Sequence, residues 1–211
     1  MSRFDLRQLR QRGQLFFIGC LCGLSCLLTS CKEEDDAVEE YANWQANNDE
    51  YFSNLVAQAL KNSSVNVWEV VPCYTVPTVG YNRNYYDNIV AEKLEQGSGT
   101  TSPLLTDSVE VHYSGRLLPS ASYPQGYLFD SSFAGTFDPV TATPTKFAVT
   151  GVVKGFSTAL MKMHRGDHWR IYIPYQLGYG STARSAIPAY STLIFDLRLE
   201  DFWRKTKGDR E

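Results

Sequence analysis

The chain has 211 residues, enough for one domain of ordinary size with appendages but not comfortably for two full domains. Hydrophobic residues make up 43% of the chain, charged residues make up 20%, and the formal net charge is −3. These values are typical of a globular protein. They argue against a disordered chain and against a protein that binds nucleic acid.

The first thirty residues predict a signal peptide. Four arginines between residues 3 and 12 precede an apolar run at 15–28, which is shorter than the ~20 residues that a membrane-spanning helix needs. The run ends in Leu28-Thr29-Ser30-Cys31, which resembles a bacterial lipobox. The resemblance implies cleavage before Cys31 and attachment of lipid to its thiol, with an uncleaved apolar helix as the alternative.

Cleavage before Cys31 would also decide which cysteines remain in the mature chain. Cys20, Cys22 and Cys26 would leave with the signal, Cys31 would be acylated, and Cys73 would remain as a thiol. No internal disulfide is then expected.

Residues 31–37 read as an acidic tether, because Lys32 is followed by four acidic residues. The pattern is similar to the signal that exports lipoproteins to the outer face of the outer membrane in Bacteroidetes. We therefore expect a lipid anchor in the outer membrane, and both a periplasmic and a surface-exposed position stay open.

Residues 38–61 predict an amphipathic helix without Gly or Pro. Its apolar and aromatic residues recur at helical spacing and are Tyr41, Trp44, Phe52, Leu55, Val56 and Ala59. This stripe favours a packing face over a ligand site, although a face that binds a partner or a second copy is an alternative. Residues 62–84 contain a short strand pattern at 65–71 followed by turn residues, and the sequence assigns this segment no role.

From residue 85 onward the pattern is that of a sheet with one helix. Strands are expected at 87–96, 109–117, 168–174 and 193–200, where apolar and polar residues alternate, and a short helix at 156–163. Few helices among several strands indicate an antiparallel α+β domain, with a sheet packed over a helix.

Five short motifs then point to a family. They are Val111-His112-Tyr113-Ser114-Gly115, Phe129-Asp130-Ser131-Ser132, Gly151-Val152-Val153-Lys154-Gly155-Phe156, Ile173-Pro174 with Leu177-Gly178-Tyr179-Gly180, and Ile187-Pro188 with Thr192-Leu193-Ile194-Phe195-Asp196. Each motif is weak alone, but five in this order and spacing resemble FKBP-type peptidyl-prolyl cis/trans isomerases over about residues 85 to 202.

The resemblance implies a fold and a domain plan. The fold is α+β, an FKBP-like antiparallel sheet curved around one short helix and preceded by an N-terminal helical extension. The plan is a lipoprotein signal peptide at 1–30, the acidic tether at 31–37, a helix and linker at 38–84, and the isomerase domain at 85–204.

The resemblance also implies a pocket and its lining. Phe147 would flank this pocket, Phe156 stands where the family often has tryptophan, and Thr145 stands where an aromatic wall residue is common. The implied site residues are Tyr113, Phe129, Asp130, Val152, Val153, Phe156, Tyr179, Ile187 and Phe195. Macrolide binding follows from the resemblance as well, with an affinity that Phe156 leaves open, whereas no cofactor and no metal are implied.

The expected function is cis/trans isomerisation of X-Pro bonds in proline-containing segments, assisting the folding of secreted or outer-membrane proteins. By resemblance, the backbone N–H of Ile187 and the hydroxyl of Tyr179 would hold peptide carbonyls, and Asp130 would lie near the twisting carbonyl carbon. The alternative is a catalytically weak FKBP-like lipoprotein that binds peptides or acts as a scaffold. The short stretch 181–186 leaves no room for the extra domain of chaperone-type relatives.

Other chemistries have little support. His164, Asp167 and His168 lie close in sequence, but no further Cys or His cluster completes a metal site. The serines lack a nucleophile motif such as GxSxG, and no Gly-rich phosphate loop follows a strand.

Overall fold

The computed structural model describes residues 39–62, 67–77 and 83–204. The predicted signal peptide, Cys31 and the acidic tether lie outside the described residues. All described residues belong to one compact unit, Val38–Glu211. Within them, no helix has the length and apolar character needed to cross a membrane.

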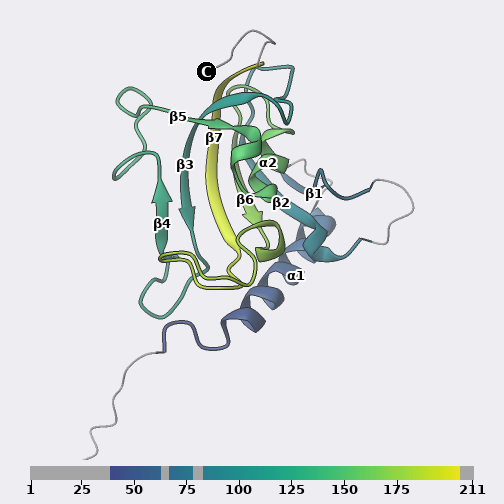
Figure 1. Cartoon of the computed structure of the whole chain (residues 1–211), viewed down its shortest axis with the longest axis vertical. Helices are drawn as coiled ribbons and strands as arrows, with labels where there is room; N and C mark the ends of the chain where they lie inside the picture. The colour runs from purple at the N-terminus through teal and green to yellow at the C-terminus, as the bar shows by residue number, and fades with distance from the viewer. Residues whose placement is uncertain (1–38, 63–66, 78–82, 205–211) are drawn as a thin grey trace, which may run out of the picture. The chain divides into compact units, whose positions relative to one another are not determined.

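The described strands form one antiparallel sheet (Figure 1). Its spatial order is β1-β2-β6-β7-β3-β4, and β5 also pairs with β3. The predicted strands at 87–96, 109–117, 168–174 and 193–200 correspond to β2, β3, β6 and β7. The strands are β1 (Trp68–Pro72), β2 (Asn88–Glu95), β3 (Ser108–Arg116), β4 (Leu128–Ser131), β5 (Thr145–Ala148), β6 (His168–Ile173) and β7 (Leu193–Trp203).

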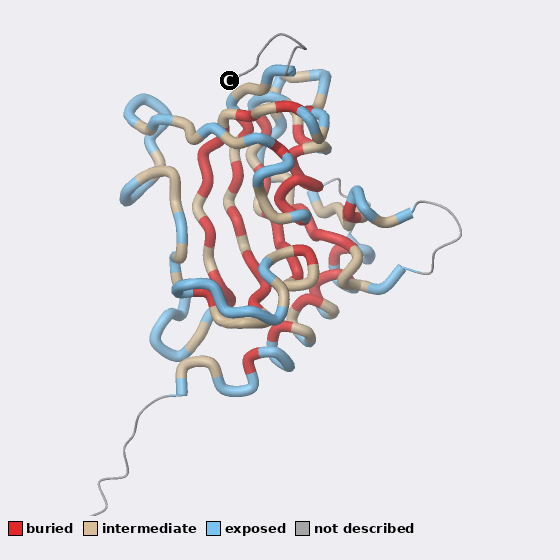
Figure 2. Tube along the Cα trace, viewed as in Figure 1, coloured by how far each residue is buried: buried red, intermediate tan, exposed pale blue. Residues whose placement is uncertain are grey.

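Helix α2 (Lys154–Leu160) packs on one face of this sheet. Residues at alternate positions of β3, β6 and β7 are buried beneath it, and Figure 2 shows this alternation along the strands. Gly155 permits the close approach of the helix, because a Cβ there would lie 2.3 Å from Cγ2 of Ile173. The predicted α+β fold, an antiparallel sheet with one short helix on it, is confirmed.

Helix α1 (Trp44–Asn62) packs on a second hydrophobic cluster against the sheet. Phe52, Leu55, Val56 and Ala59 are buried there with Val90 and Tyr172 of the sheet. The helix begins six residues later than the sequence predicts, because Asn43 has the left-handed φ of 52°.

Residues that the sequence left without a role extend the same sheet. Strand β1 pairs with β2 from Trp68 opposite Glu92 to Pro72 opposite Asn88. Cys73 directly follows β1, is only 1% exposed and has its Sγ within 3.5 Å of the Thr158 hydroxyl on α2. In the described residues, the sheet therefore runs across the predicted boundary at residue 84.

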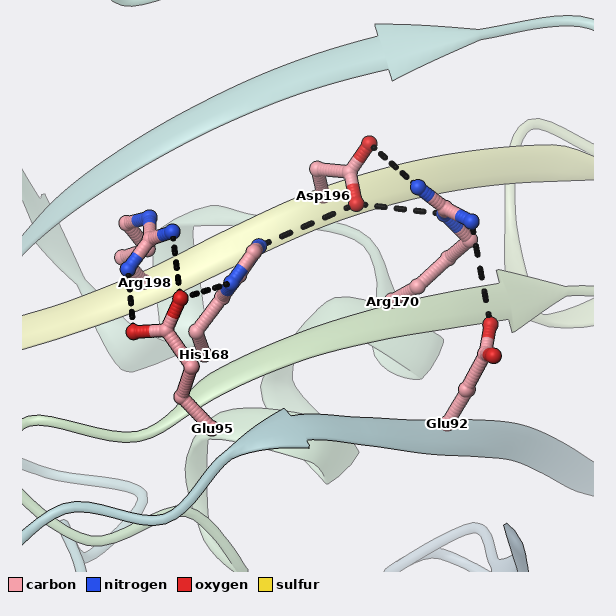
Figure 3. Close-up of polar contacts among 6 residues, drawn as sticks. All are labelled: Glu92, Glu95, His168, Arg170, Asp196 and Arg198. Carbon is pink, nitrogen blue, oxygen red and sulfur yellow. Dashed lines mark hydrogen bonds and ion pairs between the residues drawn. The ribbon is translucent and has the colours of Figure 1, made fainter. Parts of the chain in front are cut away.

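A ladder of charged side chains crosses β2, β6 and β7 (Figure 3). Arg198 donates two hydrogen bonds to Glu95, at 2.9 and 3.0 Å, and Arg170 donates to Asp196 at 3.1 Å. His168 lies between the two carboxylates, with Nδ1 3.3 Å from Glu95 Oε1 and Nε2 3.8 Å from Asp196 Oδ1. Arg170 and Asp196 lie directly opposite each other on the neighbouring strands β6 and β7, whereas Arg198 of β7 reaches across β6 to Glu95 of β2. The first pair supports the register of these two strands.

In the part of the chain that the structure describes, three short 3-10 helices connect the main elements. They are η2 (Tyr85–Asp87), η3 (Val149–Gly151) and η4 (Tyr175–Leu177). The second leads into α2 and the third into the segment 178–192, and both border the site described next.

Candidate active site

A cavity of about 490 Å³ lies between α2 and the strands β3, β4, β5 and β7. We call it the aromatic cavity. It is lined by Tyr113, Asp130, Phe147, Gly151, Val152, Val153, Phe156, Gly178, Tyr179, Arg184 and Phe195.

Three buried aromatic rings form its base. Tyr113, Phe156 and Phe195 are 8%, 3% and 5% exposed. Phe156 meets Phe195 edge to face at 5.1 Å between ring centroids, and Tyr113 meets Phe156 in the same way at 6.1 Å. Phe147 of β5 packs beside them, 5.7 Å from Tyr113. Edge-to-face contacts of this kind hold rings in fixed orientations, so the base is both apolar and well defined.

Gly115 explains how aromatic rings from two strands meet over β3. A Cβ at this position would lie 2.6 Å from Cζ of Phe129 and 2.6 Å from Cε1 of Phe195. Both rings therefore occupy space that any other residue would fill, and they meet edge to face with centroids 5.5 Å apart.

A polar pair lies beside the apolar base. The Tyr113 hydroxyl donates a hydrogen bond of 2.9 Å to Asp130 Oδ2. Burial, then this bond and the charge of Asp130, raises the pKa of Tyr113 well above its usual value, so the phenol stays protonated. Asp130 is itself exposed, opposite Gly115 in the register of β3 and β4, and thus presents a carboxylate at the rim.

The opposite rim comes from the corner between η3 and α2. Val152 and Val153 are extended there and partly exposed. The Ser157 hydroxyl donates to the Val149 carbonyl at 2.7 Å, which fixes this corner against the helix. Tyr179, 38% exposed, follows η4 and completes the rim together with Arg184.

The structure brings together seven of the nine site residues predicted from the sequence. Phe129 and Ile187 are not in the lining. Phe129 supports it from behind, through its contact with Phe195.

Ile187 differs from its expected role. Its backbone N–H donates to the Arg184 carbonyl at 2.8 Å, so this amide is already paired within its own loop. Its side chain is 8% exposed and borders a neighbouring cavity.

Arg184 is a lining residue that the sequence did not indicate. It lies in an irregular segment, where no periodic pattern distinguishes a functional arginine from a solvated one. Gly151 and Gly178 were likewise not predicted as lining residues, although both lie inside the quoted motifs.

The arrangement suits an apolar group bound among the rings and a polypeptide backbone held at the rim. Phenol, guanidinium and carboxylate groups surround the opening, and the base carries no group suited to covalent catalysis beyond the Tyr113 phenol, whose proton is held. Such a site acts by removing water and by electrostatics rather than by forming a bond.

Comparison with known proteins gives a family match for part of the chain. Residues 99–200 match the family model described as FKBP-type peptidyl-prolyl cis-trans isomerase. The chain is 37% identical over 139 residues to the "Macrophage infectivity potentiator" of Trypanosoma cruzi, with 58% of this chain and 65% of that protein covered. It is 39% identical over 107 residues to the "FKBP-type 22 kDa peptidyl-prolyl cis-trans isomerase" of Escherichia coli K12, with 50% and 46% covered.

The chain thus covers less than two thirds of the length of these relatives. A solved structure of a peptidyl-prolyl cis-trans isomerase from Pseudomonas syringae pv. tomato aligns with 72% of this chain and 96% of its own, at 25% identity and a TM-score of 0.46.

Proposed function

Because residues 99–200 match the family model of FKBP-type peptidyl-prolyl cis-trans isomerases, we propose that this protein isomerises X-Pro bonds in polypeptide substrates. The observation that carries the proposal is the aromatic cavity, which has buried rings at its base and the Tyr113–Asp130 pair at its rim.

To accelerate isomerisation, the protein has to lower the barrier to rotation about the C–N bond of the X-Pro amide. That barrier is ~18–20 kcal/mol, because resonance stiffens the C–N bond. The planar amide is more polar than the twisted one, so an apolar site destabilises the planar form more than the transition state. The proline ring would lie against Phe156 and Phe195, where water is excluded.

The rim groups would orient the peptide. Tyr113 holds Asp130 by its hydroxyl, which would place a carboxylate near the twisting carbonyl carbon of a bound substrate. Tyr179 and Arg184 offer donors for substrate carbonyls on the other side. Arg184 would thus take part of the role that the resemblance assigned to the amide of Ile187.

The decisive experiment is the isomerisation rate of short Leu-Pro and Phe-Pro peptides with the purified protein. Phe195→Ala should lose most of the acceleration because it opens the base of the cavity. Asp130→Ala should lose about tenfold, as expected when one charge-assisted interaction of ~1.4 kcal/mol is removed. Phe137→Ala, a phenylalanine outside the cavity lining, is the matched control and should keep the wild-type rate.

Circular dichroism would establish that each variant is folded. A folded wild-type protein without any acceleration, across several residues before proline, would refute the isomerase proposal. It would leave the alternative of a peptide-binding module.

A deletion of residues 38–84 would not test the scaffold alternative cleanly. Helix α1 and strand β1 contribute buried side chains to the two hydrophobic clusters, so the deletion would remove part of the core. Substitutions of exposed α1 residues such as Asn54 and Gln58 would test partner binding without this loss.

We also propose that the protein is a lipoprotein of the outer membrane that assists the folding of secreted or outer-membrane proteins. The charged stretch, the short apolar run and the lipobox-like sequence ending at Cys31 support this proposal. Cys31→Ala should abolish labelling by a fatty acid and release the protein from the membrane fraction, and protease treatment of intact cells would separate surface from periplasmic exposure. Unchanged labelling of Cys31→Ala would refute the anchor. Macrolide binding stays a prediction.

A further inference from the structure

A second cavity of about 310 Å³ has a different character from the first. We call it the tyrosine groove. Its lining residues are aromatic, apolar or hydroxyl-bearing, and Tyr123 is 41% exposed with its ring 4.9 Å from that of Tyr127. They are Tyr41, Tyr123, Tyr127, Ala183, Ser185, Ala186, Ile187 and Pro188.

The segment before α1 builds one side of the groove. Glu40 accepts hydrogen bonds from the Ser120 hydroxyl and from the backbone N–H of Ser122, which fastens this segment to the loop between β3 and β4. Tyr41 packs edge to face on Trp44 with centroids 4.8 Å apart. These contacts hold Tyr41 in place before any ligand arrives.

The start of α1 is also fixed to the segment that forms the other side. Trp44 Nε1 donates to the Ser191 hydroxyl at 2.8 Å, and that hydroxyl donates to the Pro188 carbonyl at 2.7 Å. Residues that precede the family-matched segment 99–200 therefore help to shape a cavity at its surface.

The tyrosine groove and the aromatic cavity are both bordered by the loop 183–188. Arg184 lines the aromatic cavity, whereas its neighbours Ala183 and Ser185 line the groove. Arg184 and Ile187 exchange two backbone hydrogen bonds, at 2.9 and 2.8 Å, which close a tight turn between them. A polypeptide bound in the aromatic cavity would have to cross only this turn to reach the groove.

We propose that the tyrosine groove binds the stretch of the substrate polypeptide that flanks the isomerised proline, and that it selects extended segments rich in apolar residues or further prolines. This inference rests on the proposed isomerase function. Extended proline-rich segments are stiff, so they lose little conformational entropy when they bind. Such segments bind in aromatic-lined grooves, where their proline rings pack on the aromatic side chains. The substrate class would then be unfolded polypeptide rather than a short X-Pro unit.

The test compares a four-residue Phe-Pro peptide with a peptide of about twelve residues that carries the same Phe-Pro centre between proline-rich flanks. The full protein should show a higher kcat/KM on the long peptide. Tyr123→Ala should lower the ratio of long-peptide to short-peptide kcat/KM about three- to tenfold, the size expected for one lost aromatic contact. Tyr123→Phe should restore the ratio because it keeps the ring, and Tyr74→Ala, an equally exposed tyrosine outside both cavities, should leave it at the wild-type value.

Binding of the fluorescently labelled long peptide, measured by anisotropy, separates failure of the groove from failure of the isomerase. Equal affinity and an equal rate ratio for wild type and Tyr123→Ala would overturn the groove, whatever the activity. If the wild-type protein accelerates neither peptide but binds the long peptide more tightly than Tyr123→Ala does, the groove would be supported as a peptide site. Only the isomerase proposal would then be refuted.

Discussion

Substitution of Gly115 by alanine tests whether the cavity depends on rings that close over β3. The new Cβ would lie 2.6 Å from both the Phe129 and the Phe195 rings, a distance at which at least one ring has to move. Overpacking of this kind costs about 1–3 kcal/mol. Removal of a strand glycine returns about 0.5–1 kcal/mol. The net expected loss in the free energy of unfolding is therefore about 0–2.5 kcal/mol, with a midpoint of about 1 kcal/mol.

The same movement should lower activity, because Phe195 forms part of the cavity base. We expect isomerase activity towards a short Phe-Pro peptide to fall at least several-fold at a temperature where the variant is fully folded. Urea unfolding followed by circular dichroism gives the stability. Gly151→Ala is the matched control for stability alone, because its Cβ meets only the Ala148 Cβ, at 3.9 Å, while Gly151 itself lines the cavity. Wild-type stability together with wild-type activity in Gly115→Ala would refute the close approach of the rings as the basis of the cavity.

Two further predictions concern the connections that surround the site. Asn48 Oδ1 accepts a hydrogen bond of 2.7 Å from the buried N–H of Thr192, so Asn48→Ala should cost about 1–3 kcal/mol in urea unfolding. The exposed Asn54→Ala should cost much less, and equal losses would contradict the role of this bond. Hydrogen bonds from Arg198 and then His168 lower the pKa of Glu95 to about 2. The stability contributed by its charge is therefore complete above the ordinary glutamate pKa of 4.5 and is lost as the pH falls towards 2. The midpoint of urea unfolding, measured as the pH is lowered over this range, should fall less steeply for Glu95→Gln than for wild type. The exposed Glu200→Gln is the control and should fall as steeply as wild type. An equally steep fall for Glu95→Gln would contradict the role of the ladder.

The long strands were predictable because one of their faces is buried. Strands β3, β6 and β7 bury alternate residues, and a half-buried strand carries that period in its sequence. Strands β4 and β5 were not predicted as strands. Each has four residues and no buried position, so neither produces an apolar alternation.

The site was predictable only in part, for a related reason. Its aromatic base lies on regular elements, and the motifs that carry the family resemblance include Tyr113, Phe156 and Phe195. Loop geometry has no such signature, because Arg184 and Ile187 are positioned by mutual backbone hydrogen bonds rather than by side-chain pattern. The start of α1 escaped prediction likewise, since it depends on the backbone of Asn43.

The order of the strands bears on how the protein can be shortened. Strand β6 pairs with β7 on one side and with β2 on the other, yet β2 and β1 both precede the segment 99–200 that matches the family model. A protein trimmed to that segment would leave the backbone donors and acceptors along one side of β6 unpaired. Bare strand edges recruit other chains. The family-matched segment of this protein would therefore be a seed for strand exchange and aggregation rather than a minimal enzyme.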